Sequence, residues 1–110
     1  SAFGFSGMEI ETACRHNLPI KIVVLNNGGI GMGLEQLPTE EEIPAFALMP
    51  GAPYEKIMEA FGGKGIYVED PAELRKALDE ALAFDGPALV NVKISPTAGR
   101  KSQQFNWLTT

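Results

Sequence analysis

The sequence has only one cysteine and one histidine, and the low cysteine count excludes two kinds of protein. Cys14 is the only cysteine, so the chain has no disulfide framework and no cysteine-based zinc site. We expect Cys14 to be a small core residue, and a chain of this kind suits a reducing, cytoplasmic compartment. His16, the only histidine, stands at the expected end of a helix, where a surface role is expected rather than catalysis.

Long apolar runs and basic stripes are missing as well. No apolar run approaches the roughly 18 residues of a membrane span, so we expect no membrane partner. Nine basic residues stand against fourteen acidic ones, giving a net charge of −5. Without a basic stripe, nucleic acid is not expected as a partner either. What the chain has in quantity is apolar residues, 45% of 110, which suit a globular domain with a real core.

The apolar pattern alternates between the periods of helices and strands. The predicted helices are residues 6–15, 53–61 and 70–84, and the predicted strands are residues 20–25, 66–68 and 88–94. This alternation predicts an α/β fold, a parallel sheet with crossover helices. The strand at 20–25 is almost wholly apolar, which is typical of a parallel strand covered on both faces. Residues 28–51 have no strong pattern, and a loop of that length is usually functional or mobile.

The last predicted helix has the clearest beginning. Asp70 is a favoured cap, Pro71 suits the first helical position, and Glu73 suits the third. The apolar positions that follow lie on one face of the helix: Leu74, Leu78 and Leu82.

A glycine-rich stretch, IVVLNNGGIGMG (residues 22–33), follows the first predicted strand. Ligands of open α/β sheets bind at the carboxyl ends of strands, where Asn26 and Asn27 stand. One interpretation is a simple turn, because Asn-Gly pairs tolerate positive φ angles. A second is a cation site, because amide and carbonyl oxygens suit Mg²⁺ and glycines let the backbone approach closely. A dinucleotide fingerprint is excluded, because the glycine spacing differs from G-x-G-x-x-G.

Residues 1–30, SAFGFSGMEIETACRHNLPIKIVVLNNGGI, resemble the motif of thiamine-diphosphate-dependent enzymes. That motif starts with Gly-Asp and a small residue, continues through Glu, Thr and Arg on a helix, and ends with Leu-Pro, a strand and Asn-Asn. Two segments are most similar to the branch of 2-hydroxyacyl-CoA lyase and oxalyl-CoA decarboxylase. They are SAFGFSGMEIET, and AFGGKG followed by DPAELRKAL. The tail RKSQQFNWLT (residues 100–109) resembles the lyase. The matching positions are Ser1, Glu9, Thr12, Arg15, Leu18, Pro19, Asn26 and Asn27.

The resemblance implies thiamine diphosphate and Mg²⁺ as cofactors. In that family the metal is held by an Asp carboxylate, an Asn side chain and a backbone carbonyl two residues later, which implies Asn27 and the carbonyl of Gly29 here. The Asp would stand immediately before Ser1. The backbone amides of Ser1 and Ala2 are expected to bind the diphosphate, and Ile30 is grouped with the cofactor-binding residues. The glutamate that activates the cofactor lies in another domain of a neighbouring subunit, so no catalytic residue is expected in this chain.

The implied reaction is the reversible cleavage of a 2-hydroxyacyl-CoA into formyl-CoA and an aldehyde or ketone. Two alternatives stay open: decarboxylation of oxalyl-CoA, and a non-catalytic α/β binding module. We expect residues 1–94 to be the C-terminal part of the cofactor-binding domain and residues 95–110 to be a tail that covers the active site. The expected partners are an acyl-CoA substrate, the rest of a larger parent chain, and further copies in a homodimer or homotetramer. This piece alone is expected to be inactive.

One position departs from the branch that the sequence resembles. After GGI that branch often has tyrosine, whereas this chain has Gly31. Exchanging a phenol for hydrogen leaves room in a densely packed site. We therefore expect Gly31 to line a substrate pocket that accepts branched or bulky carbonyl partners, including ketones. The competing expectation is that Met32 or a residue of another domain fills the gap.

In the complete enzyme, Gly31→Tyr should lower kcat/KM more for a branched 2-hydroxyacyl-CoA than for an unbranched one, because the new ring takes up the space of the branch. Steady-state kinetics with the two substrates check this. An equal effect on both substrates would mean that Gly31 does not face the acyl group.

Overall fold

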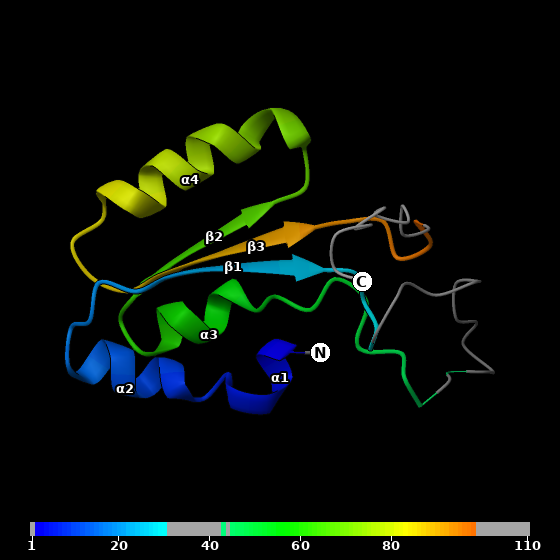
Figure 1. Cartoon of the computed structure of the whole chain (residues 1–110), viewed down its shortest axis with the longest axis horizontal. Helices are drawn as coiled ribbons and strands as arrows, with labels where there is room; N and C mark the ends of the chain where they lie inside the picture. The colour runs from blue at the N-terminus through cyan, green and yellow to red at the C-terminus, as the bar shows by residue number, and fades with distance from the viewer. Residues whose placement is uncertain (1, 31–42, 44, 99–110) are drawn as a thin grey trace, which may run out of the picture.

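A computed structural model describes residues 2–30, 43 and 45–98 as three layers, with a parallel sheet between helices (Figure 1). α4 covers one face of the sheet, and α2 and α3 lie on the other, so the predicted α/β fold is confirmed. The strands stand in the order β1-β3-β2, and both pairings are parallel. The elements are α1 (Ala2–Ser6), α2 (Glu9–Arg15), β1 (Lys21–Asn26), α3 (Glu55–Ala60), β2 (Lys64–Val68), the 3₁₀ turn η1 (Pro71–Glu73), α4 (Leu74–Ala83) and β3 (Ala88–Lys93).

The helix predicted over residues 6–15 is in fact two helices. α1 ends at Ser6 and α2 begins at Glu9, with Gly7 and Met8 in a turn between them. A Cβ atom on Gly7 would lie 2.9 Å from the carbonyl oxygen of Phe3, so the chain folds back on itself where only glycine fits. Because apolar spacing continues across this turn, the pattern alone suggested one helix.

β2 begins at Lys64, earlier than the strand predicted at 66–68. The prediction missed this beginning because of Gly65. Glycine is a poor strand former, which hid this part of the strand. Here its missing side chain brings α3 onto the sheet: a Cβ atom at position 65 would lie 2.3 Å from the carbonyl oxygen of Glu55. The close contact between α3 and β2 therefore depends on a residue without a side chain.

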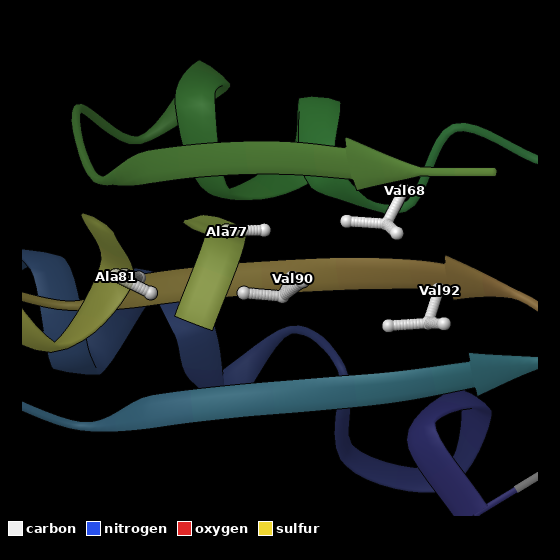
Figure 2. Close-up of a cluster of buried hydrophobic side chains, with 6 residues drawn as sticks. Val68, Ala77, Ala81, Val90 and Val92 are labelled. Atoms are coloured by element: carbon white, nitrogen blue, oxygen red, sulfur yellow. The ribbon is translucent and has the colours of Figure 1, made fainter. Parts of the chain in front are cut away.

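Alanines, not leucines, hold α4 against the sheet (Figure 2). Ala77 and Ala81 are buried against the valines of β2 and β3. Small residues let the helix axis lie close to the strands, so Leu74 and Leu78 pack at the sides of the contact and Leu82 is 67% exposed. The expectation that Leu82 shares the apolar face is therefore wrong. The buried cluster comprises Val68, Ala77, Ala81, Ala88, Val90 and Val92.

The predicted beginning of this helix is confirmed in its cap. Asp70 Oδ1 accepts a hydrogen bond of 2.8 Å from the backbone amide of Ala72. The first turn is the 3₁₀ turn η1, and the α-helix proper begins at Leu74.

The second core lies on the other face of the sheet, where α2 and α3 meet it. Met58 of α3 and Leu89 of β3 are completely buried there. Cys14 is only partly buried and packs at the side of this cluster, with its sulfur 3.7 Å from that of Met58, so the expectation of a core position is met in part. The buried members are Ile10, Val24, Met58 and Leu89.

β1 is covered on one face only, contrary to the expectation from its apolar sequence. Val23 is 48% exposed and Leu25 is 64% exposed, because α4 lies over β2 and β3. Among the described residues β1 pairs with β3 alone, so its other edge has no strand beside it. No helix in the described part of the chain has the length and apolarity to cross a membrane.

Gly65→Ala should lower the free energy of unfolding by about 1–3 kcal/mol, since the added methyl group must push α3 off the sheet. Gly4→Ala is the matched control, because a Cβ atom there meets no other atom within 4 Å. Urea unfolding of both variants measures the difference. Equal stability of the two variants would contradict the proposed contact.

Candidate functional site

The carboxyl end of β1 continues into a tight turn of Asn26, Asn27, Gly28 and Gly29. The Oδ1 atom of Asn26 accepts a hydrogen bond of 3.2 Å from the amide of Gly28. The Oδ1 atom of Asn27 accepts one of 3.2 Å from the amide of Gly29. Gly28 has a φ angle of 72°, which explains why glycine follows the two asparagines. The turn interpretation is therefore correct, and the asparagine side chains are what hold the turn.

Gly29 forms an isolated antiparallel bridge with Ala47. The two hydrogen bonds flank the pair: Ile30 donates to Phe46 over 2.8 Å, and Leu48 donates to Gly28 over 2.7 Å. In such a non-hydrogen-bonded pair, the paired residue's own amide and carbonyl point away from its partner. The Gly29 amide accordingly donates to the side chain of Asn27. The carbonyl of Gly29 therefore lies on the same side of the loop as the Asn27 amide group.

α1 approaches the same turn from the N-terminal side. A hollow of about 510 Å³ beside β1 is lined by Ala2, Asn27 and Gly29, among others. A neighbouring cleft of about 310 Å³ has Ile30 and the aromatic Phe3 and Phe5 in its lining, together with the same turn. Ala2, Asn27, Gly29 and Ile30, all predicted from the sequence, are thus brought together. Ser1 and Gly31 lie outside the described residues, as do residues 99–110 of the predicted tail.

An aromatic contact fixes α1 beside the site. The rings of Phe3 and Tyr54 meet edge to face, with centroids 5.2 Å apart and an interplanar angle of 68°. Tyr54 immediately precedes α3, so α1 is anchored to the helix that packs on the sheet. Periodicity identified Tyr54 only as a helix residue, and nothing in the pattern indicated its contact with Phe3.

A buried polar cluster lies under the turn, and sequence reasoning missed most of it. The carbonyl oxygen of Ala52 accepts hydrogen bonds from the amide of Tyr54 (2.9 Å), from Asn26 Nδ2 (3.2 Å) and from Asn91 Nδ2 (3.0 Å). Asn91 Nδ2 also donates to Glu55 Oε2 over 2.8 Å. The one available signal was an asparagine inside the apolar strand ALVNVK.

The charged residues of the motif lie on α2. Arg15 binds Glu11 with a nitrogen–oxygen distance of 2.9 Å, and this hydrogen bond holds the pKa of the Glu11 carboxyl below its ordinary value. Arg15 also donates to Thr12 over 3.5 Å and lies 3.0 Å from the ring of His16. These groups are partly or fully exposed and contact one another, which agrees with bracing of the helix.

The oxygens at the turn fit a hard cation that brings further ligands with it. Among the described residues there is no group of three or more His, Cys, Asp or Glu side chains that could hold a metal. Asn27 and Gly29 offer instead an amide oxygen and a carbonyl oxygen on one side of the loop. Mg²⁺ accepts such neutral ligands and shares its shell with phosphate oxygens. The donor set therefore suits a metal–diphosphate pair better than a bare ion.

Comparison with known proteins matches residues 1–92 to the family described as "Thiamine pyrophosphate enzyme, C-terminal TPP binding domain". 2-Hydroxyacyl-CoA lyase 1 of Homo sapiens is 49% identical over 99% of this chain and 21% of its own length. 2-Hydroxyacyl-CoA lyase of Arabidopsis thaliana is 50% identical, covering 93% of this chain and 19% of its own length. Oxalyl-CoA decarboxylase of Escherichia coli (strain K12) is 48% identical, and the match covers 93% of this chain and 18% of the decarboxylase.

The chain thus spans about a fifth of the length of the curated relatives it matches. The matched region includes α1, β1 and the turn at Asn27 and Gly29. With this match and the α/β structure, the chain belongs to the thiamine pyrophosphate enzyme family and matches its C-terminal cofactor-binding domain.

Proposed function

We propose that this chain supplies the diphosphate- and Mg²⁺-binding part of a carbon–carbon lyase. The enzyme would cleave a 2-hydroxyacyl-CoA into formyl-CoA and an aldehyde or ketone. The observation that carries the proposal is that α1 lines one hollow together with Asn27 and Gly29, at the carboxyl end of β1. This is the edge of a parallel sheet at which ligands of α/β proteins bind.

Each residue of the site has a separate part in this proposal. The Oδ1 atom of Asn27 and the carbonyl of Gly29 would hold Mg²⁺, and their neutrality limits the negative charge around the metal. The backbone amides of Ser1 and Ala2 would bind diphosphate oxygens, and Ile30 borders the adjoining cleft. When bound, thiamine diphosphate supplies an electron sink for breaking the carbon–carbon bond. The part of this chain is to bind and orient that group.

The lyase is preferred over the decarboxylase because of the end of the chain. Residues 100–109 resemble the lyase tail. We propose the tail as a cover of the active site. The described residues that lead into it, Ile94 and Pro96, line a small cleft beside Asn27.

The partners that we propose are an acyl-CoA and the remainder of a longer enzyme chain, assembled as a homodimer or homotetramer in the cytoplasm. The exposed Val23 and Leu25 of β1 support a covering partner, because adjacent apolar side chains on a sheet are usually buried. A non-catalytic binding module is the second candidate. Turnover by the isolated 110 residues would contradict our proposal, since the activating glutamate is expected elsewhere.

Asn27→Leu in the complete enzyme should weaken binding of thiamine diphosphate in the presence of Mg²⁺ by at least about tenfold, since a metal ligand is lost. Asn27→Asp is the matched control, because it keeps an oxygen that can bind the metal and accept the hydrogen bond from Gly29. Calorimetric titration gives both affinities, and thermal unfolding checks that each variant folds. Wild-type affinity in Asn27→Leu would remove Asn27 from the metal site.

The complete enzyme should release an aldehyde or ketone from a 2-hydroxyacyl-CoA, as expected for the lyase, and do so faster than it releases carbon dioxide from oxalyl-CoA. Product analysis with the two substrates checks this, and enzyme without added cofactor is the control. Carbon dioxide from oxalyl-CoA, with no carbonyl product from the other substrate, would assign the decarboxylase instead.

A further inference from the structure

Asn91 occupies a position where an apolar residue would be expected. It lies in the middle of β3, the central strand, and its side chain is 0% exposed. Burying an amide among apolar groups is unfavourable unless its polar atoms find partners. The Oδ1 atom of Asn91 accepts no hydrogen bond within the part of the chain that the structure describes. The favourable contribution of this side chain therefore comes from its Nδ2 atom.

The two hydrogens of Asn91 Nδ2 have two acceptors, one just before α3 and one at its first residue. One is the carbonyl oxygen of Ala52 at 3.0 Å, and the other is Glu55 Oε2 at 2.8 Å. Ala52 and Glu55 are themselves buried. Asn91 therefore ties the central strand to the beginning of α3 and the residues just before it.

The carbonyl of Ala52 also accepts a hydrogen bond of 3.2 Å from Asn26 Nδ2 of β1. The register explains why Asn26 and Asn91 reach the same carbonyl. Asn91 of β3 is paired with Val24 of β1, and Asn26 lies two residues beyond Val24 on β1. Alternate residues of a strand share a face, so both asparagines project toward the side on which α3 lies. Amides from two neighbouring strands thus converge on one carbonyl oxygen.

The orientation of Asn26 is passed directly to the turn beyond it. While its Nδ2 atom donates to Ala52, its Oδ1 atom accepts from the amide of Gly28 over 3.2 Å. Gly28 in turn accepts a hydrogen bond of 2.7 Å from the amide of Leu48, which forms one side of the bridge at Gly29. A displaced Ala52 carbonyl would therefore free the Asn26 side chain and loosen the turn.

We propose that Asn91 is a positioning residue for the cofactor site. Acting with Glu55 through the carbonyl of Ala52, it holds Asn26 in the orientation that places Asn27 and Gly29. Asn91 itself touches neither metal nor diphosphate. The inference rests on the proposed function for what the turn binds, but the hydrogen-bonded chain from Asn91 to Gly28 can be tested without any cofactor.

The first experiment measures hydrogen exchange in the cofactor-free complete enzyme. Asn91→Leu fills the space but cannot donate, and Asn91→Ala leaves the space empty. Val90→Ala is the matched control, since Val90 is equally buried on the same strand but belongs to the cluster under α4. Backbone amides of Gly28 and Leu48 should exchange at least about tenfold faster in both Asn91 variants than in Val90→Ala.

The second experiment measures binding of thiamine diphosphate with Mg²⁺ in the same variants, below the melting temperature of each. The Kd should rise by about tenfold in both Asn91 variants and stay near the wild-type value in Val90→Ala. The KM for the cofactor should rise in parallel, while kcat at saturating cofactor changes little, because the reacting groups are untouched.

The outcomes separate the two proposals. If wild-type enzyme binds no thiamine diphosphate, the proposed function fails, and the exchange experiment still decides the positioning role. If wild type binds but the Asn91 variants exchange and bind like Val90→Ala, the positioning role is overturned. Should Asn91→Leu fail to fold, Asn91→Ala and Val90→Ala, which both remove side-chain atoms from the same strand, still give the comparison.

Discussion

The parallel pairing of β3 with both of its neighbours is the constraint on which the other features depend. Its register joins Lys21 to Ala88 on one side and Lys64 to Ala88 on the other, so the three carboxyl ends come together. A slip by one residue would turn Asn91 from the α3 face to the α4 face and replace it with a valine. The meeting of Asn26 and Asn91 at one carbonyl, and hence the geometry of the turn, is a consequence of this register.

The two faces of the sheet are built differently. On the α4 side, the buried cluster consists of alanines and valines. On the α3 side, the apolar core around Met58 passes into a buried polar cluster as it nears the carboxyl ends. Polar groups in a low-dielectric interior constrain orientation more strictly than apolar packing does. The proposed ligand site thus lies beside the part of the domain in which hydrogen bonds replace some of the apolar packing.

The sequence predicted the features whose cause is local. The strand order along the chain, the Asp70 cap and the turn at Asn27 follow from residues close together, and the site residues are predicted by the resemblance to a known motif. The features it missed depend on distant contacts: Gly65 under α3, Phe3 against Tyr54, and Asn91 with Glu55. The break at Gly7 was hidden because apolar spacing runs through it. The turn does not conflict with the proposed ligand site, because the Asn27 side chain that accepts the hydrogen bond from Gly29 is also the proposed metal ligand.

The one-sided covering of β1 has a consequence for how the chain folds. β1 leaves the ribosome long before β3, and the two cannot pair until the whole segment between them has been made. Pairing between strands so far apart in the sequence is slow, because a large loop must close first. During that interval the edge of β1 that pairs with no described strand, together with the exposed side chains of Val23 and Leu25, can associate with other chains instead. Early capture of this strand, by a chaperone or by another segment of the same polypeptide, therefore favours correct folding over aggregation.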